Sequence, residues 1–232
     1  MSKFAFVFPG QGSQSIGMLS TLAEAYPVVQ ETFRQASAVL GYDLWELTQA
    51  GPKEKLNQTE FTQPALLAAG TAAWRVYCEQ PTAKTPDYLA GHSLGEYTAW
   101  VCSGALDFED GIKLVAARGQ AMQAAVPQGV GAMAAIIGLD DQLVAEVCQA
   151  AAESQVCSPA NFNSIGQVVI AGDKLAVERA VLLAKTKGAK IAKLIPVSVP
   201  SHCALMADAA KALSPLLESL TFNAPKIPVV NN

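Results

Sequence analysis

The stretch Tyr88-Leu89-Ala90-Gly91-His92-Ser93-Leu94-Gly95 carries the pattern Gly-x-Ser-x-Gly directly after a short apolar segment. This pattern is typical of a nucleophile elbow, a tight turn between a strand and a helix that exposes a serine hydroxyl at its tip. Residues 96–102 read as a helix, so both flanking elements that the pattern requires are predicted. We therefore expect an α/β fold in which Ser93 acts as a nucleophile.

A serine nucleophile needs a base, and the chain contains only two histidines, His92 and His202. Adjacent residues on a sharp turn point in different directions, so His92 is badly placed to accept the proton of Ser93. A helix that starts at Ser201 would place His202 near the positive end of a helix dipole. Taken alone, a histidine beside a helix start is more often a surface or capping residue. The need of Ser93 for a base favours the catalytic interpretation of His202.

Two regions of different pattern make up the chain. Residues 4–8 form an apolar run that ends at Pro9-Gly10, which is typical of a strand buried on both faces of a largely parallel sheet. After Gly129 the predicted order becomes strand, helix, two strands, helix and strand, which is the order of a ferredoxin-like unit. We predict a hydrolase-like main domain, residues 1–127 and 199–232, with an inserted ferredoxin-like subdomain, residues 128–198.

Prolines mark two of the predicted helices. Thr62 as the capping residue, with Pro64 in the first turn, predicts a helix that runs to about residue 77. The last helix is expected to start near residue 204 and to be interrupted at Pro215, because proline cannot continue the backbone hydrogen bonds of a helix.

Arg118 lies on the apolar side of a helix predicted from about residue 107 to 126, in line with Leu114, Val115 and Met122. A buried guanidinium without an anion is costly, so we expect a negative group to meet it. The anion is either an internal Asp or Glu or a substrate carboxylate, which arginine binds with two parallel hydrogen bonds. Periodicity alone leaves these two alternatives about equal.

Gly10-Gln11-Gly12 forms a glycine-flanked loop after the first predicted strand. The loop lacks the Gly-Lys-Ser/Thr ending of a phosphate-binding loop, and its spacing to Gly17 does not match the dinucleotide pattern, so nucleotide binding is not indicated. The backbone amide of Gln11 would instead form an oxyanion hole with the amide of Leu94, the residue after the nucleophile. Taken alone, such a loop is more often an ordinary tight turn.

The composition argues against several classes of protein. Hydrophobic residues make up 51% of the 232 residues and charged residues 16%, which is typical of an enzyme with a buried sheet. A net charge of −4 argues against nucleic-acid binding, and the longest apolar runs reach only half of the roughly 20 residues that span a membrane. The five cysteines form no Cys-x-x-Cys pair, so we expect no disulfide framework and no metal site. We expect a cytoplasmic protein that acts as a monomer, without a membrane or nucleic-acid partner.

Several further segments occur along the chain in a characteristic order. They are Phe8-Pro-Gly-Gln-Gly-Ser-Gln14, Gln63-Pro-Ala65, Gly91-His-Ser-Leu-Gly-Glu-Tyr97, Arg118-Gly-Gln-Ala-Met122, Asn161-Phe-Asn163 with Val168-Val-Ile-Ala-Gly172, and Pro200-Ser-His202. In this order the chain resembles, from end to end, the malonyl-CoA:acyl carrier protein transacylase family of fatty-acid synthesis. The acyltransferase domains of polyketide synthases are similar.

The resemblance implies an acyltransferase that moves a malonyl group from malonyl-CoA to the pantetheine thiol of acyl carrier protein through a malonyl-serine intermediate. Malonyl-CoA is then a substrate, acyl carrier protein is the partner, and no cofactor is needed. Ser93 would be the nucleophile and His202 its base, with the amides of Gln11 and Leu94 as the oxyanion hole. Arg118 would bind the malonyl carboxylate. The other residues implied to line the pocket are Gln63, His92, Met122 and Asn161.

Other interpretations stay open at this point. A serine hydrolase or thioesterase would use the same elbow and transfer the acyl group to water. Members of the family continue for several tens of residues past residue 232, so we expect the C-terminal part of the main domain to be missing from this chain. In the family that part supplies a contact that orients the catalytic histidine. A chain that truly ended at Asn232 would favour a non-catalytic domain that binds acyl carriers.

Overall fold

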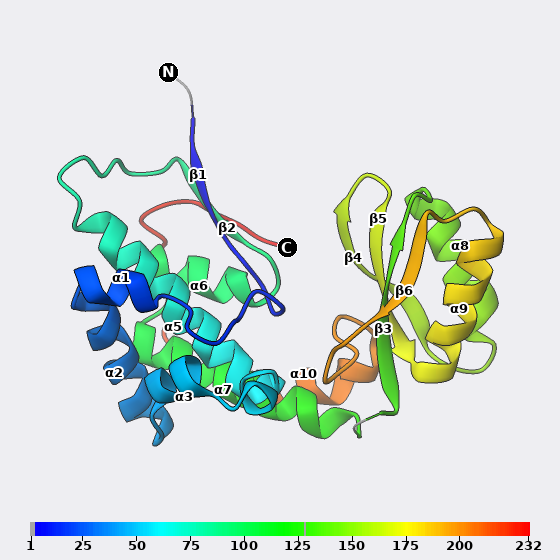
Figure 1. Ribbon diagram of the computed structural model, residues 1–232, viewed down its shortest axis with the longest axis horizontal. Helices are drawn as coiled ribbons and strands as arrows, with labels where there is room; N and C mark the ends of the chain where they lie inside the picture. Colours follow the sequence, from blue (N-terminus) through cyan, green and yellow to red (C-terminus); the bar gives the residue numbers. More distant parts are fainter. Residues whose placement is uncertain (1–2, 128) are drawn as a thin grey trace. The chain divides into compact units, whose positions relative to one another are not determined.

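A computed structural model describes residues 3–127 and 129–232, and Figure 1 shows its helices and strands. The chain divides into two compact units, one comprising Met1–Gln120 with Pro215–Asn232 and the other Ala121–Ser214. Gln128, where the predicted inserted subdomain begins, lies outside the described residues. Helices and strands occur together in both units, so the predicted α/β class is confirmed.

The first unit contains a three-stranded parallel sheet with the order β1-β2-β7. Its strands are β1 (Ala5–Phe8), β2 (Tyr88–Gly91) and β7 (Val229–Val230). The ends of β1 and β2 are in register, since Phe8 lies opposite Gly91. Parallel strands end at the same edge of a sheet, so the segments that follow the three strands lie next to one another at that edge.

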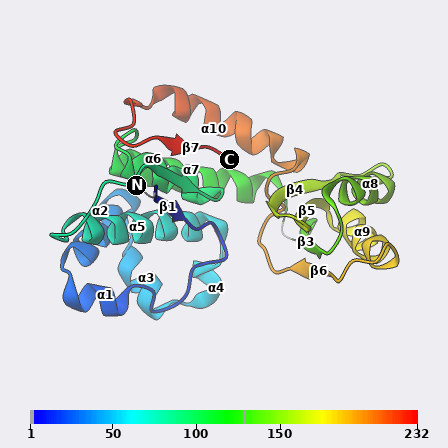
Figure 2. The same ribbon diagram turned by 90° about the horizontal axis from the view of Figure 1, so that it is seen from above.

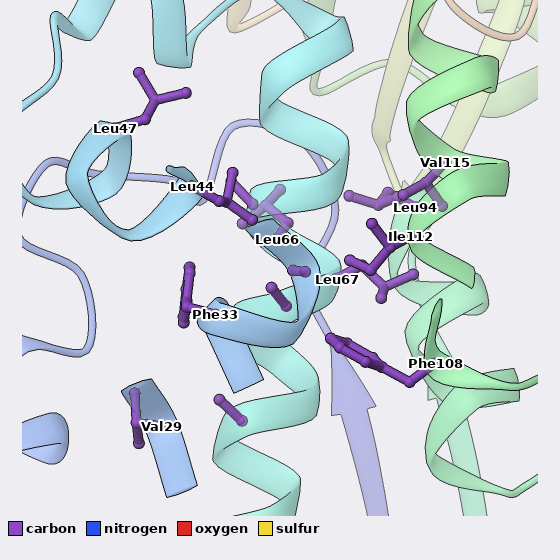
Figure 3. Close-up of a cluster of buried hydrophobic side chains, with 14 of the residues drawn as sticks. Val29, Phe33, Leu44, Leu47, Leu66, Leu67, Leu94, Phe108, Ile112 and Val115 are labelled. Atoms are coloured by element: carbon purple, nitrogen blue, oxygen red, sulfur yellow. The ribbon is translucent and has the colours of Figure 1, made fainter. Parts of the chain in front are cut away.

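Helices supply most of the core of the first unit. They are α1 (Ser20–Ala25), α2 (Val28–Leu40), α3 (Leu44–Ala50), α4 (Lys53–Leu56), α5 (Thr59–Cys78), α6 (Leu94–Cys102) and the greater part of α7 (Phe108–Ala125). Figure 3 shows Leu94 of α6 directed toward Ile112 and Val115 of α7, with Leu67 of α5 beside them. Leu94 is 1% exposed, so the residue that follows the elbow serine is anchored in this core.

Strand β1 is buried on one face only, so the expectation of burial on both faces is wrong. Phe6 contacts the rings of Trp74 and Tyr77 of α5, and Phe8 is 5% exposed. Val7, which points to the opposite face, is 70% exposed. Alternate residues of a strand face opposite sides, and in the described part of the chain the helices cover only the side of Phe6 and Phe8.

Helix α5 starts four residues earlier than the sequence predicts, with Gln58 in place of Thr62 as the capping residue. Its first residue is Thr59, and Pro64 lies inside the helix instead of in its first turn. The hydroxyl of Thr62 donates to the carbonyls of Leu56 and Gln58, so Thr62 does not cap the helix by accepting hydrogen bonds from amides. Proline inside a helix removes one backbone hydrogen bond. The helix continues through Pro64 because the residues around it, from Thr62 to Ala68, are all buried and their packing offsets this loss.

The second unit is built around a four-stranded antiparallel sheet with the order β4-β5-β3-β6. Along the chain its elements are β3 (Gly131–Ile137), α8 (Asp141–Ala152), β4 (Cys157–Ser164), β5 (Gln167–Asp173), α9 (Lys174–Thr186) and β6 (Ile191–Ile195). Figure 2 shows α8 and α9 on the same side of this sheet. Between the helices and the sheet lies an apolar core that includes Ile136, Val147, Ile170 and Val177.

The last helix differs from the prediction in its relation to Pro215. After the 3-10 turn Ala204–Met206, helix α10 runs without interruption from Ala207 to Ser219 and contains Pro215. Ala209 and Leu213 are buried on one side of the helix. Because proline removes only one backbone hydrogen bond, this packing is sufficient for the helix to continue.

Candidate active site

The serine predicted as nucleophile lies in a strained turn between β2 and α6. Ser93 has φ 52° and ψ −105°, a conformation that residues with a side chain rarely adopt. The amide of His92 donates to the carbonyl of Phe8 at 3.0 Å, and the amide of Gly95 donates to the carbonyl of His92 at 2.9 Å. The turn is therefore attached both to the end of β1 and to the first turn of α6.

Two glycines make this turn possible by allowing backbone segments to approach closely. A Cβ atom added to Gly91 would lie 1.9 Å from the carbonyl carbon of Gly95, and one added to Gly95 would lie 2.1 Å from the carbonyl oxygen of Phe8. No side chain fits at either residue. The Gly-x-Ser-x-Gly pattern is thus explained by the backbone geometry on each side of Ser93.

The two amides predicted to form an oxyanion hole both lie at the edge where the strands end. Leu94 is the first residue of α6, so its amide has no acceptor within the helix. Gln11 lies in a turn after β1, in a loop where the hydroxyl of Ser13 donates to the carbonyl of Gly10 at 2.7 Å. Gly10 itself lies against the elbow, since an added Cβ would be 2.6 Å from the carbonyl oxygen of His92 and 2.9 Å from its Nδ1.

A chain of hydrogen bonds links Arg118 to the Gln11 loop. Nη1 of Arg118 donates to Oε1 of Gln63 at 2.7 Å, and Nε2 of Gln63 donates to Oγ1 of Thr59 at 3.0 Å. The hydroxyl of Thr59 in turn donates to Oε1 of Gln11 at 2.8 Å. Thr59 and Gln63 are fully buried, so their polar groups need the hydrogen bonds that this series of side chains supplies.

Thr59 belongs to this region although its sequence position did not predict it. It precedes Gln63 by four residues, and residues four apart lie on the same side of a helix. A helix predicted with Thr62 as its capping residue leaves Thr59 outside it, so the start of α5 had to be known before this spacing could be used.

Arg118 is bound by neutral groups. Besides its hydrogen bond to Gln63, its guanidinium lies 5.4 Å from the centre of the Tyr97 ring. Four ion pairs are found among residues 3–127 and 129–232, and none of them involves Arg118. Of the two predicted partners, the internal carboxylate is therefore not seen within this part of the chain.

Helix α7 reaches Gln63 because glycine follows the arginine. A Cβ atom added to Gly119 would lie 2.6 Å from Cα of Glu60 and 2.8 Å from the carbonyl oxygen of Thr59. The close contact of α7 with the first turn of α5 depends on this missing side chain. This close contact allows Arg118 to bond to Gln63, and the four-residue spacing allows Gln63 to bond to Thr59.

Three of the predicted site residues belong to the second unit. Met122 is 5% exposed and packs against Val199 and Ala209. Asn161 is half-buried in β4, opposite Val169 of β5. His202 is exposed and has φ 60°, in a turn that precedes the 3-10 helix.

The prediction of a helix start near residue 204 is confirmed, so the start at Ser201 that would have placed His202 close to a helix dipole does not occur. Cys203, in an extended conformation, is the capping residue of the 3-10 helix that begins at Ala204. The positive φ of His202 turns the chain before any helical residue, so His202 is separated from the helix by one residue.

The cysteine beside His202 is a poor competitor for the role of nucleophile. Burial raises the pKa of the Cys203 thiol, and its Sγ donates to the carbonyl of Pro200 at 3.2 Å. Burial also raises the pKa of Cys102 at the end of α6. A thiol attacks as its thiolate, so a raised pKa leaves both thiols protonated and unreactive near neutral pH.

All five cysteines are unbridged. Within residues 3–127 and 129–232, no group of three or more His, Cys, Asp or Glu side chains is arranged to hold a metal ion. No helix in the described ranges has the length and apolar character needed to cross a membrane.

Comparison with known proteins agrees with the resemblance inferred from the motifs. Residues 5–231 match the family described as "Acyl transferase domain". The malonyl CoA-acyl carrier protein transacylase of Escherichia coli strain K12 is 62% identical over 232 residues, which cover all of this chain and 75% of the relative. The transacylase of Bacillus subtilis is 43% identical over 233 residues and 73% of its length.

Solved structures of similar proteins have the same fold. The malonyl CoA-acyl carrier protein transacylase of Coxiella burnetii has a TM-score of 0.98 and 56% identity, over all of this chain and 73% of that one. A malonyl-transacylase in complex with a type II polyketide synthase acyl-carrier protein has a TM-score of 0.97 and 59% identity, over 74% of its length. The predicted family is confirmed: the chain belongs to the malonyl-CoA–acyl carrier protein transacylases, within the acyl transferase domain family.

Proposed function

We propose that this protein transfers a malonyl group from malonyl-CoA to the pantetheine thiol of acyl carrier protein through a malonyl ester of Ser93. Two relatives named for this reaction, from Escherichia coli and Bacillus subtilis, support the choice of substrate and partner. The malonyl-transacylase in complex with an acyl-carrier protein supports the choice of acceptor.

The observation that carries the proposal is the state of Arg118. Its guanidinium is half-buried, yet its hydrogen bond is to the neutral amide of Gln63 and its other contact is the face of Tyr97. A guanidinium in this setting has hydrogen-bonding capacity left for a carboxylate, which it binds more strongly than an amide. A malonyl group has a carboxylate at its free end, whereas an acetyl group has none.

In the proposed first half-reaction, Oγ of Ser93 attacks the thioester carbonyl while its proton passes to the imidazole of His202. The backbone amides of Gln11 and Leu94 stabilise the negative oxygen of the tetrahedral intermediate. The bond to sulfur then breaks, and the leaving CoA thiolate takes the proton from His202. The products are the malonyl-serine ester and free CoA.

The second half-reaction repeats these steps with a different thiol. The pantetheine thiol of the carrier protein gives its proton to His202 and attacks the ester carbonyl of malonyl-Ser93. The ester oxygen leaves as the serine hydroxyl after it regains a proton from His202. The roles of Arg118 and of the amides are the same in both halves, because the acyl group keeps its carboxylate throughout.

The role of His202 as the base is supported by the sequence, which offers only His92 as another histidine. His92 precedes the nucleophile in the elbow and lies against Gly10. We assign His92 and Gln63 to the lining of the acyl pocket, together with Met122 and Asn161 of the second unit. That the protein acts as a monomer, without a cofactor and in the cytoplasm, stays a prediction.

We also propose that residues 128–198 form a ferredoxin-like subdomain inserted into a hydrolase-like main domain, residues 1–127 and 199–232. Supporting the first part, the elements of the second unit follow the order strand, helix, strand, strand, helix, strand, and form an antiparallel sheet with the strand order β4-β5-β3-β6. In support of the second part, a parallel sheet leads into a nucleophile elbow.

The proposed function is tested by following CoA release from malonyl-CoA with and without acyl carrier protein. A transferase gives one burst of CoA per enzyme without the carrier and continuous release with it. Continuous release without any carrier would instead identify a hydrolase. If no CoA is released and mass spectrometry finds no malonyl adduct, the protein lacks the proposed activity.

A further inference from the structure

The carboxamide of Asn232 is hydrogen-bonded to three parts of the nucleophile elbow. Its Oδ1 accepts from the backbone amide of Ser93 at 3.0 Å, and its Nδ2 donates to the carbonyl of Gly91 at 2.7 Å. Nδ2 also donates to Oε2 of Glu96 at 2.7 Å. The side chain thus bonds to the end of β2, to the nucleophile residue and to the first turn of α6.

The sheet places Asn232 at this point. Strand β7 pairs in parallel with β2, with Val230 opposite Ala90, so the second residue after β7 reaches the turn that follows β2. The backbone amide of Asn232 adds a further hydrogen bond, at 3.3 Å, to the carboxylate of Glu96. Asn232 is therefore held by its backbone as well as by its side chain.

The arrangement requires an amide on one side and a carboxylate on the other. Oδ1 of Asn232 faces a donor, the amide of Ser93, while Nδ2 faces two acceptors, a carbonyl and a carboxylate. Glu96 lies in the first turn of α6, where the helix dipole favours a negative charge. A second carboxylate in place of Asn232 would face the carboxylate of Glu96 and the carbonyl of Gly91.

We propose that Asn232 and Glu96 are a positioning pair that holds Ser93 in its strained, reactive conformation. The φ of 52° at Ser93 is unfavourable for a residue with a side chain, and such a conformation persists only where surrounding contacts enforce it. Asn232 contacts Gly91 before the strained residue, Ser93 itself, and Glu96 after it. The proposal rests on the proposed function, because it takes Ser93 as the nucleophile.

A negative charge placed at residue 232 should disturb the elbow, and the effect should depend on pH. In the variant Asn232→Asp, the new carboxylate faces the carboxylate of Glu96 where the wild-type amide donates a hydrogen bond. Their repulsion raises the pKa of one of the two groups. Above that pKa both are ionised and the elbow loses its support. As the pH falls through it, one carboxyl gains a proton, donates a hydrogen bond to the other, and restores the link.

The experiment measures the rate of malonyl-serine formation by quenched mass spectrometry of the full chain with malonyl-CoA, from about pH 5 to pH 8. Each variant rate is divided by the wild-type rate at the same pH, which removes the titration of the catalytic base. For Asn232→Asp we expect a rate roughly 10- to 100-fold below wild type at pH 8, with the ratio rising as the pH falls. Adding Glu96→Gln should restore much of the rate at pH 8, because the glutamine amide can donate to the aspartate.

The matched control is Asn231→Asp, which makes the same change of charge one residue away and should follow the wild-type profile. Thermal melting of every variant shows whether it is folded. The proposal is overturned if Asn232→Asp acylates like wild type at pH 8, or if its loss is the same at every pH and Glu96→Gln gives no relief. Absence of malonyl-serine in the wild-type protein would overturn the proposed function instead.

Discussion

The two units differ in what they bury. Among the described residues, eight polar residues are buried as a whole, and all of them belong to the first unit: Thr32, Thr48, Thr59, Thr62, Gln63, Thr71, Thr98 and Ser103. The core of the second unit is made of small and branched apolar residues between one sheet and two helices. Buried polar groups need fixed partners, so they define the orientation of their neighbours in a way that apolar contacts do not.

This difference indicates how substitutions should act in the two units. Changes to the hydrogen-bonded residues Arg118, Gln63 and Thr59 of the first unit should alter the rate of acyl transfer and the choice of acyl group. Changes to the apolar core of the second unit should lower the free energy of unfolding and leave the choice of acyl group unaltered.

The largest effect is expected for Ser93→Ala, which removes the proposed nucleophile. Malonyl transfer should fall by a factor on the order of 10⁴ or more, because no other group can form the ester. The adduct found by mass spectrometry after incubation with malonyl-CoA should disappear, while the melting temperature stays near that of wild type or rises through relief of strain. A persistent adduct would place the nucleophile at another residue.

The next effect is expected for Arg118→Ala, which should lower malonyl transfer by roughly 10²- to 10³-fold. Acetyl transfer should not fall in parallel, since acetyl leaves the arginine without its anion in the wild-type protein. The measurement is kcat/KM for malonyl-CoA and for acetyl-CoA.

Arg75→Ala is the matched control for Arg118→Ala. Arg75 is another half-buried arginine of the first unit, with Nη1 donating to Thr32 and Gln35 and its guanidinium 4.7 Å from the Phe108 ring. This variant should lower stability without a change in the ratio of malonyl to acetyl transfer. Equal losses on both substrates in Arg118→Ala would remove Arg118 from the acyl pocket.

A smaller effect is expected for Thr59→Val, which keeps the shape of the side chain and removes the hydroxyl between Gln63 and Gln11. Nε2 of Gln63 and Oε1 of Gln11 each lose their hydrogen bond to this hydroxyl, and we expect malonyl transfer to fall roughly 10- to 100-fold. The ratio of malonyl to acetyl transfer should also fall, because Gln63 no longer orients Arg118. Thr59→Ser retains the hydroxyl and should behave like wild type; if it loses as much rate as Thr59→Val, the hydroxyl is not the cause.

The smallest effect on transfer is expected for Ile170→Val in the core of the second unit. Ile170 is fully buried, so the lost methylene should lower the free energy of unfolding by about 0.5–1.5 kcal/mol. Chemical denaturation measures this change, and kcat/KM ratios should stay at the wild-type value. Ile165→Val, at a fully exposed residue of the same unit, is the control and should change neither quantity. A changed acyl preference in Ile170→Val would contradict the contrast between the units.

Several parts of the fold could be predicted because they depend on neighbouring residues. The elbow follows from glycines two residues to each side of Ser93, and the strand and helix order of the second unit follows from the period of its apolar residues. The predictions for Pro64 and Pro215 failed for a common reason. Proline weakens a helix locally, but burial of the same helix by distant residues decides whether it continues.

The sequence by itself determined the elbow at Ser93 and, through short motifs spread from Phe8 to His202, the family, and it predicted that Arg118 needs an anion. Each motif is expressed in residues close together in the chain. The tertiary structure alone decided which groups meet Arg118 and Ser93. Gln63 reaches Arg118 across 55 positions and Asn232 reaches Ser93 across 139, and both contacts depend on how helices and strands pack. No periodicity records such contacts, because they are set by the register of parallel strands and by the approach of one helix to another at Gly119.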